Sequence, residues 1–258
     1  MWRRILGLGL PLFILATPLA AAAQPAAGDD ASQQLLIFSR TAGFRHGSIE
    51  VGVPAIAALA EQHDVAVHAT EDPAYFTDEN LARFDAVIFV STTGEFLGEE
   101  QRAAFERYVR GGGGYVGVHA ASDVPAGWWP WYEGLVGATF RSHPRNQDAG
   151  VIVVDGEHVS TSMLESPWTR YDEWYNFRAL PEGVNVLLRL DTDSYEGSAH
   201  PGNHPIAWYH EYDGGRAFYT GLGHTNESFI EDEAFLEHLW GGITYAAGYG
   251  AEAAARAE

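Results

Sequence analysis

The sequence predicts a single α/β domain with a mostly parallel sheet, a flavodoxin-like three-layer sandwich with added antiparallel strands in its second half. Strands and helices alternate through the first half of the chain, which is typical of right-handed crossovers between parallel strands. The strands of that half are almost continuously apolar, as in FDAVIFV (84–90), which is typical of strands covered by helices on both faces. In the second half, apolar runs follow one another with few helical segments between them, which favours antiparallel pairing.

The elements of the first half follow from hydrophobic periodicity. Apolar residues recur at helical spacing in IEVGVPAIAALAEQH, after the N-cap candidate Ser48, and glycines end the helical pattern of LGEEQRAAFERYVRGGGG. The two helices are expected at 49–63 and 97–114. The strands are expected at 35–39, 64–70, 84–90 and 115–119.

The second half is expected to add strands and to close the fold with a helix. Asp213, Gly214 and Gly215 form a turn between two apolar runs, so these runs are expected to pair as a hairpin. The strands of this half are expected at 151–155, 184–191, 205–213 and 215–223. The closing helix is expected at 229–248.

The first residues have the layout of a secretory signal peptide. Arg3 and Arg4 are followed by a short apolar run and by small residues that end at Ala23. A membrane anchor is the alternative, but prolines interrupt the apolar run, and a span needs about 18 or more apolar residues. We expect cleavage, no stable membrane anchor, and a mature protein in the periplasm or outside the cell. The expected organisation is a signal peptide (1–23), a linker (24–34), one domain (35–248) and a tail (249–258).

Composition excludes several kinds of chemistry. The chain has no cysteine and no lysine, so thiolate nucleophiles, cysteine-ligated metals and lysine Schiff bases are excluded. A formal net charge of −20 repels phosphate backbones, so no nucleic-acid partner is expected. No nucleotide cofactor is expected, and the sequence leaves the oligomeric state open.

Three loops are expected to meet at one edge of the sheet. In open α/β sheets, ligands bind beyond the carboxyl ends of the parallel strands. The loop after the first strand carries His46, the loop after 84–90 carries Thr93, and the strand at 115–119 ends at His119. The topology therefore predicts that both histidines lie near one crevice.

Histidine is the residue type that most strongly indicates a site. A neutral imidazole can bind a divalent metal such as zinc, and it can also transfer protons near neutral pH. No HExxH or other fixed-spacing motif is present, so a metal site would have to be assembled from distant loops. Five of the 11 histidines follow strands or lie in loops that contain Gly or Pro: His46, His119, His143, His204 and His224.

The segment YDEWYNF (171–177) places two carboxylates among aromatic residues. In an alternating strand, Asp172 and Glu173 face opposite sides, so one is expected to turn inward and the other outward. A carboxyl group among Trp and Tyr is expected to have a raised pKa, which suits a general acid. The alternative is a strand with a solvent-facing carboxylate. The run GWWPWYEG (127–134), with Trp131, could be a platform that stacks on a sugar or a packed cap.

Together, the motifs of the chain resemble the trehalose-utilisation (ThuA-like) family. The resemblance covers about 35–248, and the motifs fall in the family's order. It implies a fold related to class I glutamine amidotransferases, in which the turn at the position of YVGVHAAS carries a nucleophilic cysteine. Here that turn carries His119, which excludes thiol glutaminase chemistry. The motifs are AGFRH, GGGYVGVHAASD, WxWYEGLxGxxFxxHPxxQ, DEWYNF, HPIAW and GRAFYTGLGH.

The resemblance also implies a carbohydrate-related site. The catalytic candidates are His46, His119, Asp172, Glu173 and His224, and a metal would be held by His46, His119 and His224. The candidates for substrate binding are Thr93, Trp131, His143, Tyr175, His204 and Trp208. His200 is an alternative to His204, because both precede a proline in HPGNHPIAW.

Two functions of different classes follow. The first is an exported enzyme that acts on a sugar or a 3-keto-glycoside by acid/base chemistry, with or without help from a divalent metal. The second is a non-catalytic carbohydrate-binding domain that has lost the nucleophile of its fold. The expected partner is a small carbohydrate in both.

Overall fold

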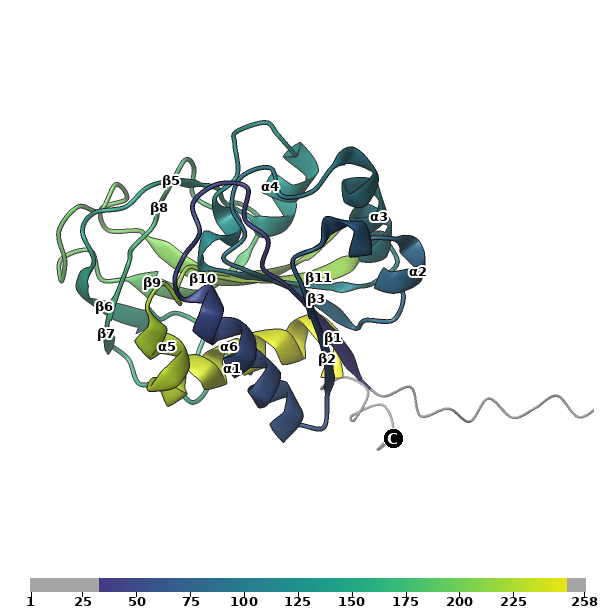
Figure 1. Ribbon diagram of the computed structural model, residues 1–258. Coiled ribbons are helices and arrows are strands. Elements are labelled where there is room, and N and C mark those ends of the chain that lie inside the picture. Colours follow the sequence, from purple (N-terminus) through teal and green to yellow (C-terminus); the bar gives the residue numbers. More distant parts are fainter. Residues whose placement is uncertain (1–32, 250–258) are drawn as a thin grey trace, which may run out of the picture. The chain divides into compact units, whose positions relative to one another are not determined.

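A nine-stranded sheet runs through the fold, which the computed structural model describes over residues 33–249 (Figure 1). Half of it is parallel, with strands in the order β2-β1-β3-β4-β11, which is the flavodoxin order. These strands are β1 (Gln34–Phe38), β2 (Ala66–Thr70), β3 (Ala86–Val90), β4 (Gly114–Val118) and β11 (Gly215–Thr220). The predicted signal peptide (1–23), most of the predicted linker and residues 250–258 of the predicted tail lie outside the described residues.

The other half of the sheet is antiparallel and continues from β11. The order there is β10-β9-β6-β7, and β10 pairs with β11 through the predicted hairpin. These strands are β10 (Pro205–Tyr212), β9 (Asn185–Leu190), β6 (Gln147–Val153) and β7 (Trp168–Asp172). A separate pair consists of β5 (Phe140–Ser142) and β8 (Asn176–Phe177).

Helices cover both faces of the sheet and so make three layers (Figure 1). One face carries α1 (Ile49–Gln62), α5 (Asn226–Ile230) and α6 (Glu233–Ala247). The other carries α2 (Asp78–Leu81), α3 (Glu99–Arg110) and α4 (Pro130–Val136). Two short 3-10 helices, η1 (Pro73–Tyr75) and η2 (His119–Ser122), complete the elements. Every residue of β3 and β4 is buried, as expected for strands between two helical layers. The predicted three-layer α/β class is confirmed.

Some predicted boundaries are wrong for local physical reasons. The single helix expected at 229–248 is broken, because Asp232 leaves the helical path and its carboxylate accepts a hydrogen bond from Phe235 N (2.9 Å), which caps α6. Ser48 does not cap α1 with its side chain, because its own backbone is already helical (φ −64°, ψ −14°). Within residues 33–249, no helix is both long and apolar enough to span a membrane.

Buried histidines away from the sheet's ligand edge make the stability depend on pH. Burial lowers the pKa of both His204 and His238 to about 4, although each donates a hydrogen bond to a carbonyl oxygen. The unfolded chain, with an ordinary histidine pKa near 6.5, therefore takes up protons first as the pH falls. We expect the free energy of unfolding to drop by roughly 2–3 kcal/mol per histidine between pH 7 and pH 4.5.

Urea unfolding at the two pH values measures this drop, and His238→Asn separates it from the titration of carboxylates. Asparagine can still donate to Ser160 O, which accepts from His238 Nδ1 at 2.9 Å, but it does not titrate. The variant should show a smaller drop by roughly 2–3 kcal/mol. An unchanged drop would contradict the assignment.

Candidate functional site

Four side chains from distant segments meet at the carboxyl ends of the parallel strands. They follow β1, β4, β7 and β11. The sheet order brings the ends of β1, β4 and β11 to one edge, whereas β7 lies at the far side of the sheet, and its end is tied to the segment after β11 by hydrogen bonds from Gly223 N and His224 N to Asp172. One potential ligand atom from each lies within 4.8 Å of every other. These residues, called the His/Glu cluster below, are His46, His119, Glu173 and His224.

His119 lies at a sharp turn directly after β4. Its φ of 48° is in the left-handed region, which non-glycine residues seldom adopt and which is common at functional sites. The hydroxyl of the buried Tyr219 donates to His119 O (2.8 Å) and so fixes this turn. His119 Nδ1 lies 2.9 Å from Gly221 O. Because a carbonyl only accepts, Nδ1 donates to it, and Nε2 is the ring nitrogen that faces the cluster.

Glu173 is the carboxylate that faces the histidines. Its Oε2 lies 3.4 Å from His119 Nε2 and 3.3 Å from His224 Nδ1, and its Oε1 lies 3.1 Å from His143 Nδ1. Burial alone would raise the pKa of Glu173, but the His119 and His224 rings lower it well below the usual value. The raised pKa expected from the aromatic neighbours is therefore wrong for Glu173, which is ionised at neutral pH.

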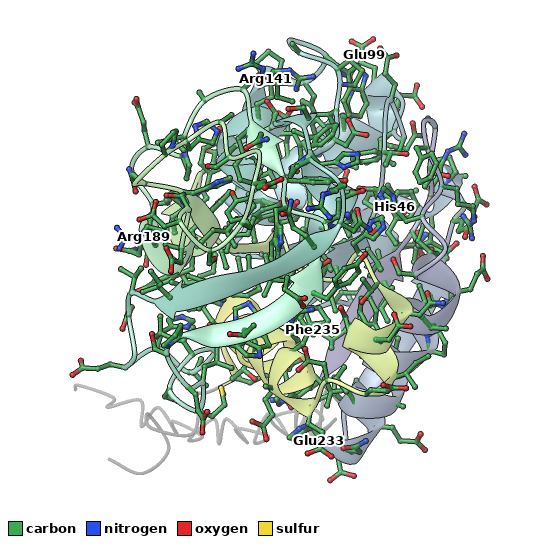
Figure 2. The ribbon with its side chains drawn as sticks, turned by 90° about the vertical axis from the view of Figure 1, so that its left-hand side faces the viewer. His46, Glu99, Arg141, Arg189, Glu233 and Phe235 are labelled. Atoms are coloured by element: carbon green, nitrogen blue, oxygen red, sulfur yellow. The ribbon has the colours of Figure 1, made fainter. Side chains whose placement is uncertain are left out.

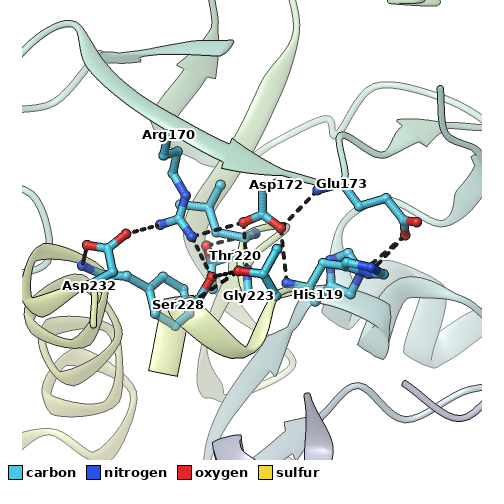
Figure 3. Close-up of polar contacts among 12 residues, drawn as sticks. His119, Arg170, Asp172, Glu173, Thr220, Gly223, Ser228 and Asp232 are labelled. Carbon is cyan, nitrogen blue, oxygen red and sulfur yellow. Dashed lines mark hydrogen bonds and ion pairs between the residues drawn. The ribbon is translucent and has the colours of Figure 1, made fainter. Parts of the chain in front are cut away.

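Asp172 is buried beside Glu173, but its carboxylate accepts hydrogen bonds mainly from backbone N–H groups (Figure 3). Its Oδ1 accepts from Glu173 N (2.9 Å) and His224 N (3.1 Å). Its Oδ2 accepts from Gly223 N (3.0 Å) and Arg170 Nη2 (3.0 Å). Neither carboxylate faces solvent, so the expected inward–outward split is wrong. The reason is that β7 ends at Asp172, and strand alternation does not continue to Glu173.

His46 lies in the loop between β1 and α1, and Figure 2 shows it within the fold. It is 5 % exposed, and its Nδ1 has no hydrogen-bond partner among residues 33–249. Burial, and then the neighbouring His119 and His224, lower its pKa to about 3, so the ring is neutral. Thr93 fixes this loop, because its hydroxyl donates to Phe44 O (2.7 Å).

His224 follows β11 and completes the cluster. Its Nδ1 lies 3.2 Å from His119 Nε2, so two ring nitrogens and Glu173 Oε2 lie at mutual hydrogen-bonding distance. Burial lowers the pKa of His224, but the Glu173 carboxylate outweighs it and raises the pKa above the ordinary value. The cluster therefore combines an ionised carboxylate with imidazoles of unequal basicity, which suits proton transfer or metal binding.

Comparison with known proteins identifies the family. The family model for trehalose utilisation, ThuA, matches residues 34–246. The chain belongs to the ThuA family. No match was found among curated protein sequences.

Solved structures agree with this assignment. A ThuA-like protein from Bacteroides uniformis ATCC 8492 shares 25 % identity and a TM-score of 0.73, over 86 % of this chain and 95 % of that one. A ThuA-like protein from Parabacteroides merdae ATCC 43184 shares 20 % identity and a TM-score of 0.69, over 84 % and 91 %. A β-galactosidase from Bacillus circulans sp. alkalophilus shares 12 % identity and a TM-score of 0.57, over 84 % of this chain and 31 % of that one, and so shares the fold alone.

In this ThuA protein, His143 and Tyr175 border the cluster. The exposed His143 also has its Nδ1 2.8 Å from Pro144 O, so that nitrogen carries a hydrogen. The Tyr175 ring packs on His119 with centroids 4.3 Å apart. Both were expected at the pocket, and the structure brings both to the cluster.

Other predicted substrate contacts lie away from the cluster. Thr93 is fully buried beneath the loop that carries His46. Trp208 is a core residue, since it is fully buried and its indole donates to Val136 O (2.9 Å). Trp131 donates to Asp213 (2.6 Å), which precedes β11, whereas His224 follows that strand. Trp131 is therefore packed near the start of β11, at the other end of that strand from His224, and none of these side chains is available to a ligand at the cluster.

Neither His200 nor His204, the two alternatives for a substrate contact, faces the cluster with a free ring nitrogen. His204 is fully buried and paired at both ring nitrogens, with Tyr175 O (2.8 Å) on one side and Tyr195 Oη (2.7 Å) on the other. His200 Nε2 faces the backbone of Phe177 (3.2 Å). His204 therefore supports the backbone of Tyr175 and cannot contact a substrate directly.

Two residues near the cluster were not assigned from the sequence. Burial raises the pKa of Asp123, although Arg178 and His119 lower it, and Asp123 lies at the end of the quoted motif GGGYVGVHAASD. Phe44 is 69 % exposed, with its ring edge-on to His46 at 4.9 Å between centroids. The phenylalanine of the AGFRH motif, in a loop that is otherwise polar, was the feature of the sequence that could have indicated a substrate contact.

Proposed function

We propose that this ThuA protein is exported and converts a sugar or a 3-keto-glycoside by acid/base chemistry at the His/Glu cluster. The observation that carries the proposal is the convergence of one ionised carboxylate and three imidazoles at the ligand edge of the sheet. The family description, trehalose utilisation, supports a carbohydrate as the substrate. The layout of residues 1–23 supports export.

The chemistry suits a ketone at C3 of a glycoside, two carbons away from C1, which bears the glycosidic oxygen. The ketone acidifies the hydrogen on C2, and a base that removes it forms an enolate between C2 and C3. The enolate can then form a C1–C2 double bond while the C1–O bond breaks and the glycosidic oxygen leaves with a proton, or it can be reprotonated at another position. His143 is suited to be the base, because its Nδ1 carries a hydrogen and leaves Nε2 as an exposed acceptor. His224, whose pKa Glu173 raises, is suited to protonate the departing oxygen.

Turnover of 3-keto-trehalose and 3-keto-glucosides by the purified protein tests this proposal. We expect loss of the keto-glycoside and appearance of a free sugar or an isomer, detected by mass spectrometry and NMR. The assay is run with and without a chelator, because a bound divalent metal such as zinc would polarise the ketone. Folded protein that consumes no keto-glycoside under either condition would contradict the proposal.

Sugar binding without turnover is the second candidate, and the exposed Phe44 beside the cluster favours a sugar-binding surface. Calorimetry against a sugar panel distinguishes the two functions. Binding without consumption that persists in His119→Ala would support the binding domain. Binding with consumption, lost in that variant, would support the enzyme.

Replacing Phe44 by alanine should weaken sugar binding at this site. The apolar face of a pyranose can stack on an exposed ring, and loss of one aromatic contact is worth about 1 kcal/mol, or roughly fivefold in the dissociation constant. Calorimetry with 3-keto-trehalose measures the change. Ile230→Ala is the matched control, since Ile230 is 62 % exposed and lies at the end of α5. Equal affinities of the two variants would remove Phe44 from the binding surface.

A further inference from the structure

We propose that Glu173, His119, His224 and His46 form one tetrahedral site for a divalent transition metal, with zinc as the best fit. The inference concerns the same cluster as the proposed function, but it rests on the positions of the ligand atoms and not on any substrate. Three imidazole nitrogens and one carboxylate oxygen are a ligand set that zinc accepts, whereas calcium and magnesium prefer oxygen ligands throughout.

The spacing of three ligand atoms matches the edges of a zinc tetrahedron. Zinc lies about 2.0–2.1 Å from nitrogen and oxygen ligands, so tetrahedral ligand atoms lie about 3.3–3.4 Å apart. The three distances are 3.2 Å (His119 Nε2 to His224 Nδ1), 3.3 Å (His224 Nδ1 to Glu173 Oε2) and 3.4 Å (His119 Nε2 to Glu173 Oε2). All three atoms therefore fit around one centre.

The backbone orients the His119 ring toward this triangle. His119 Nδ1 donates to Gly221 O, so Nε2 is the nitrogen that faces His224 Nδ1 and Glu173 Oε2. A backbone carbonyl that orients the far nitrogen is the usual outer contact of a zinc-bound histidine, and a cation at the centre would contact all three atoms together.

His46 provides the fourth ligand. Its ring centroid lies 5.0 Å from that of His119 and 5.2 Å from that of His224, and its ligand atom falls within the 4.8 Å limit of the group. His46 is only 5 % exposed, and its Nδ1 has no hydrogen-bond partner in the described part of the chain. A buried ring nitrogen without a hydrogen-bond partner is costly unless a ligand completes it. His204 shows the contrast, because both of its nitrogens are paired.

The residues behind the ligands fix their positions. Asp172 accepts from the backbone N–H groups of Glu173 and His224, and Arg170 holds Asp172 in turn (Figure 3). Such outer contacts typically change metal affinity 10- to 100-fold. The site is thus supported by a buried network of its own.

Metal analysis of the purified full chain tests the inference without any sugar. After chelation and removal of the chelator, calorimetric titration with Zn²⁺ should show one site per chain. Cobalt(II) in its place should give the strong visible absorption of a tetrahedral centre. His119→Ala and the isosteric Glu173→Gln should each weaken zinc binding by at least about 100-fold. Loss of an outer contact costs up to about 100-fold, and loss of a direct ligand should cost at least as much.

His63→Ala and His68→Ala are the matched controls, because both histidines are exposed and stack on aromatic rings, Trp240 and Tyr75. Their zinc affinity should equal that of the unaltered chain. The inference is overturned if the unaltered, folded chain does not bind zinc stoichiometrically, or if Glu173→Gln binds it as tightly. A chain that binds zinc but consumes no keto-glycoside would contradict the proposed function and leave the metal site standing.

Discussion

Glu173→Gln is expected to lower kcat/KM for a 3-keto-glycoside by about 10³-fold, within the range of 10²–10⁴ for removal of a positioned acid or base. Glutamine keeps the size of the side chain but removes the negative charge. The charge matters because it raises the pKa of His224 and accepts from His143 Nδ1 at 3.1 Å. Without it, the proposed acid is less protonated and the proposed base is less well oriented.

Steady-state kinetics with 3-keto-trehalose measures this loss, and circular dichroism shows that the fold is retained. Glu165→Gln is the matched control, because Glu165 is exposed and precedes β7, whereas Glu173 follows that strand. The control should keep full activity. If Glu173→Gln also kept it, the His/Glu cluster would not be the reacting centre.

The parallel half of the fold could be predicted because its strands are short, apolar and buried on both faces. AVIFV in β3 and GYVGV in β4 have no polar residue, so composition alone identifies them. β7 was not predicted, because WTRYD mixes charged, polar and aromatic residues and buries only Arg170 and Asp172. Its position depends on pairing with β6, which a local pattern does not contain.

The convergence of the site could also be predicted, since parallel strands bring the loops after β1 and β4 to one edge. What could not be predicted was which side chains reach it. Trp208 lies on β10 beneath α4, where its indole bonds to Val136 O, and that contact spans 72 residues. Burial by distant segments therefore decided between ligand contact and core packing.

Which of the two carboxylates faces the histidines also depends on contacts between segments distant in the sequence. The sequence placed Asp172 and Glu173 side by side but did not show that residues 223–224 would supply backbone donors to the first. Because the segment after β11 reaches the end of β7, Asp172 has four donors, and Glu173 is left for the histidines. The division of roles follows from where β7 ends.

Asp172→Asn should destabilise the protein by about 3 kcal/mol and also weaken the site. Breaking one partner of a buried ion pair costs about 3–5 kcal/mol. Both oxygens of the fully buried Asp172 face N–H donors, so an amide nitrogen opposes a donor in either orientation. In the variant, Arg170 loses its ion pair with residue 172 and keeps its ion pair with Asp232 (3.2 Å). For a domain of this size, the melting temperature should fall by about 6–12 °C.

The same substitution should reduce zinc affinity by about 10- to 100-fold at a temperature where the variant is folded, because the backbone of both Glu173 and His224 loses its acceptor. Thermal unfolding and calorimetric titration measure the two effects. Asp148→Asn is the control, since Asp148 is exposed and pairs with Tyr171 on the neighbouring strand. A variant that loses stability but binds zinc as tightly as the control would show that Asp172 supports the fold and does not orient the ligands. Loss of both, with the control unchanged, would show that one buried carboxylate couples the stability of the sheet edge to the geometry of the cluster.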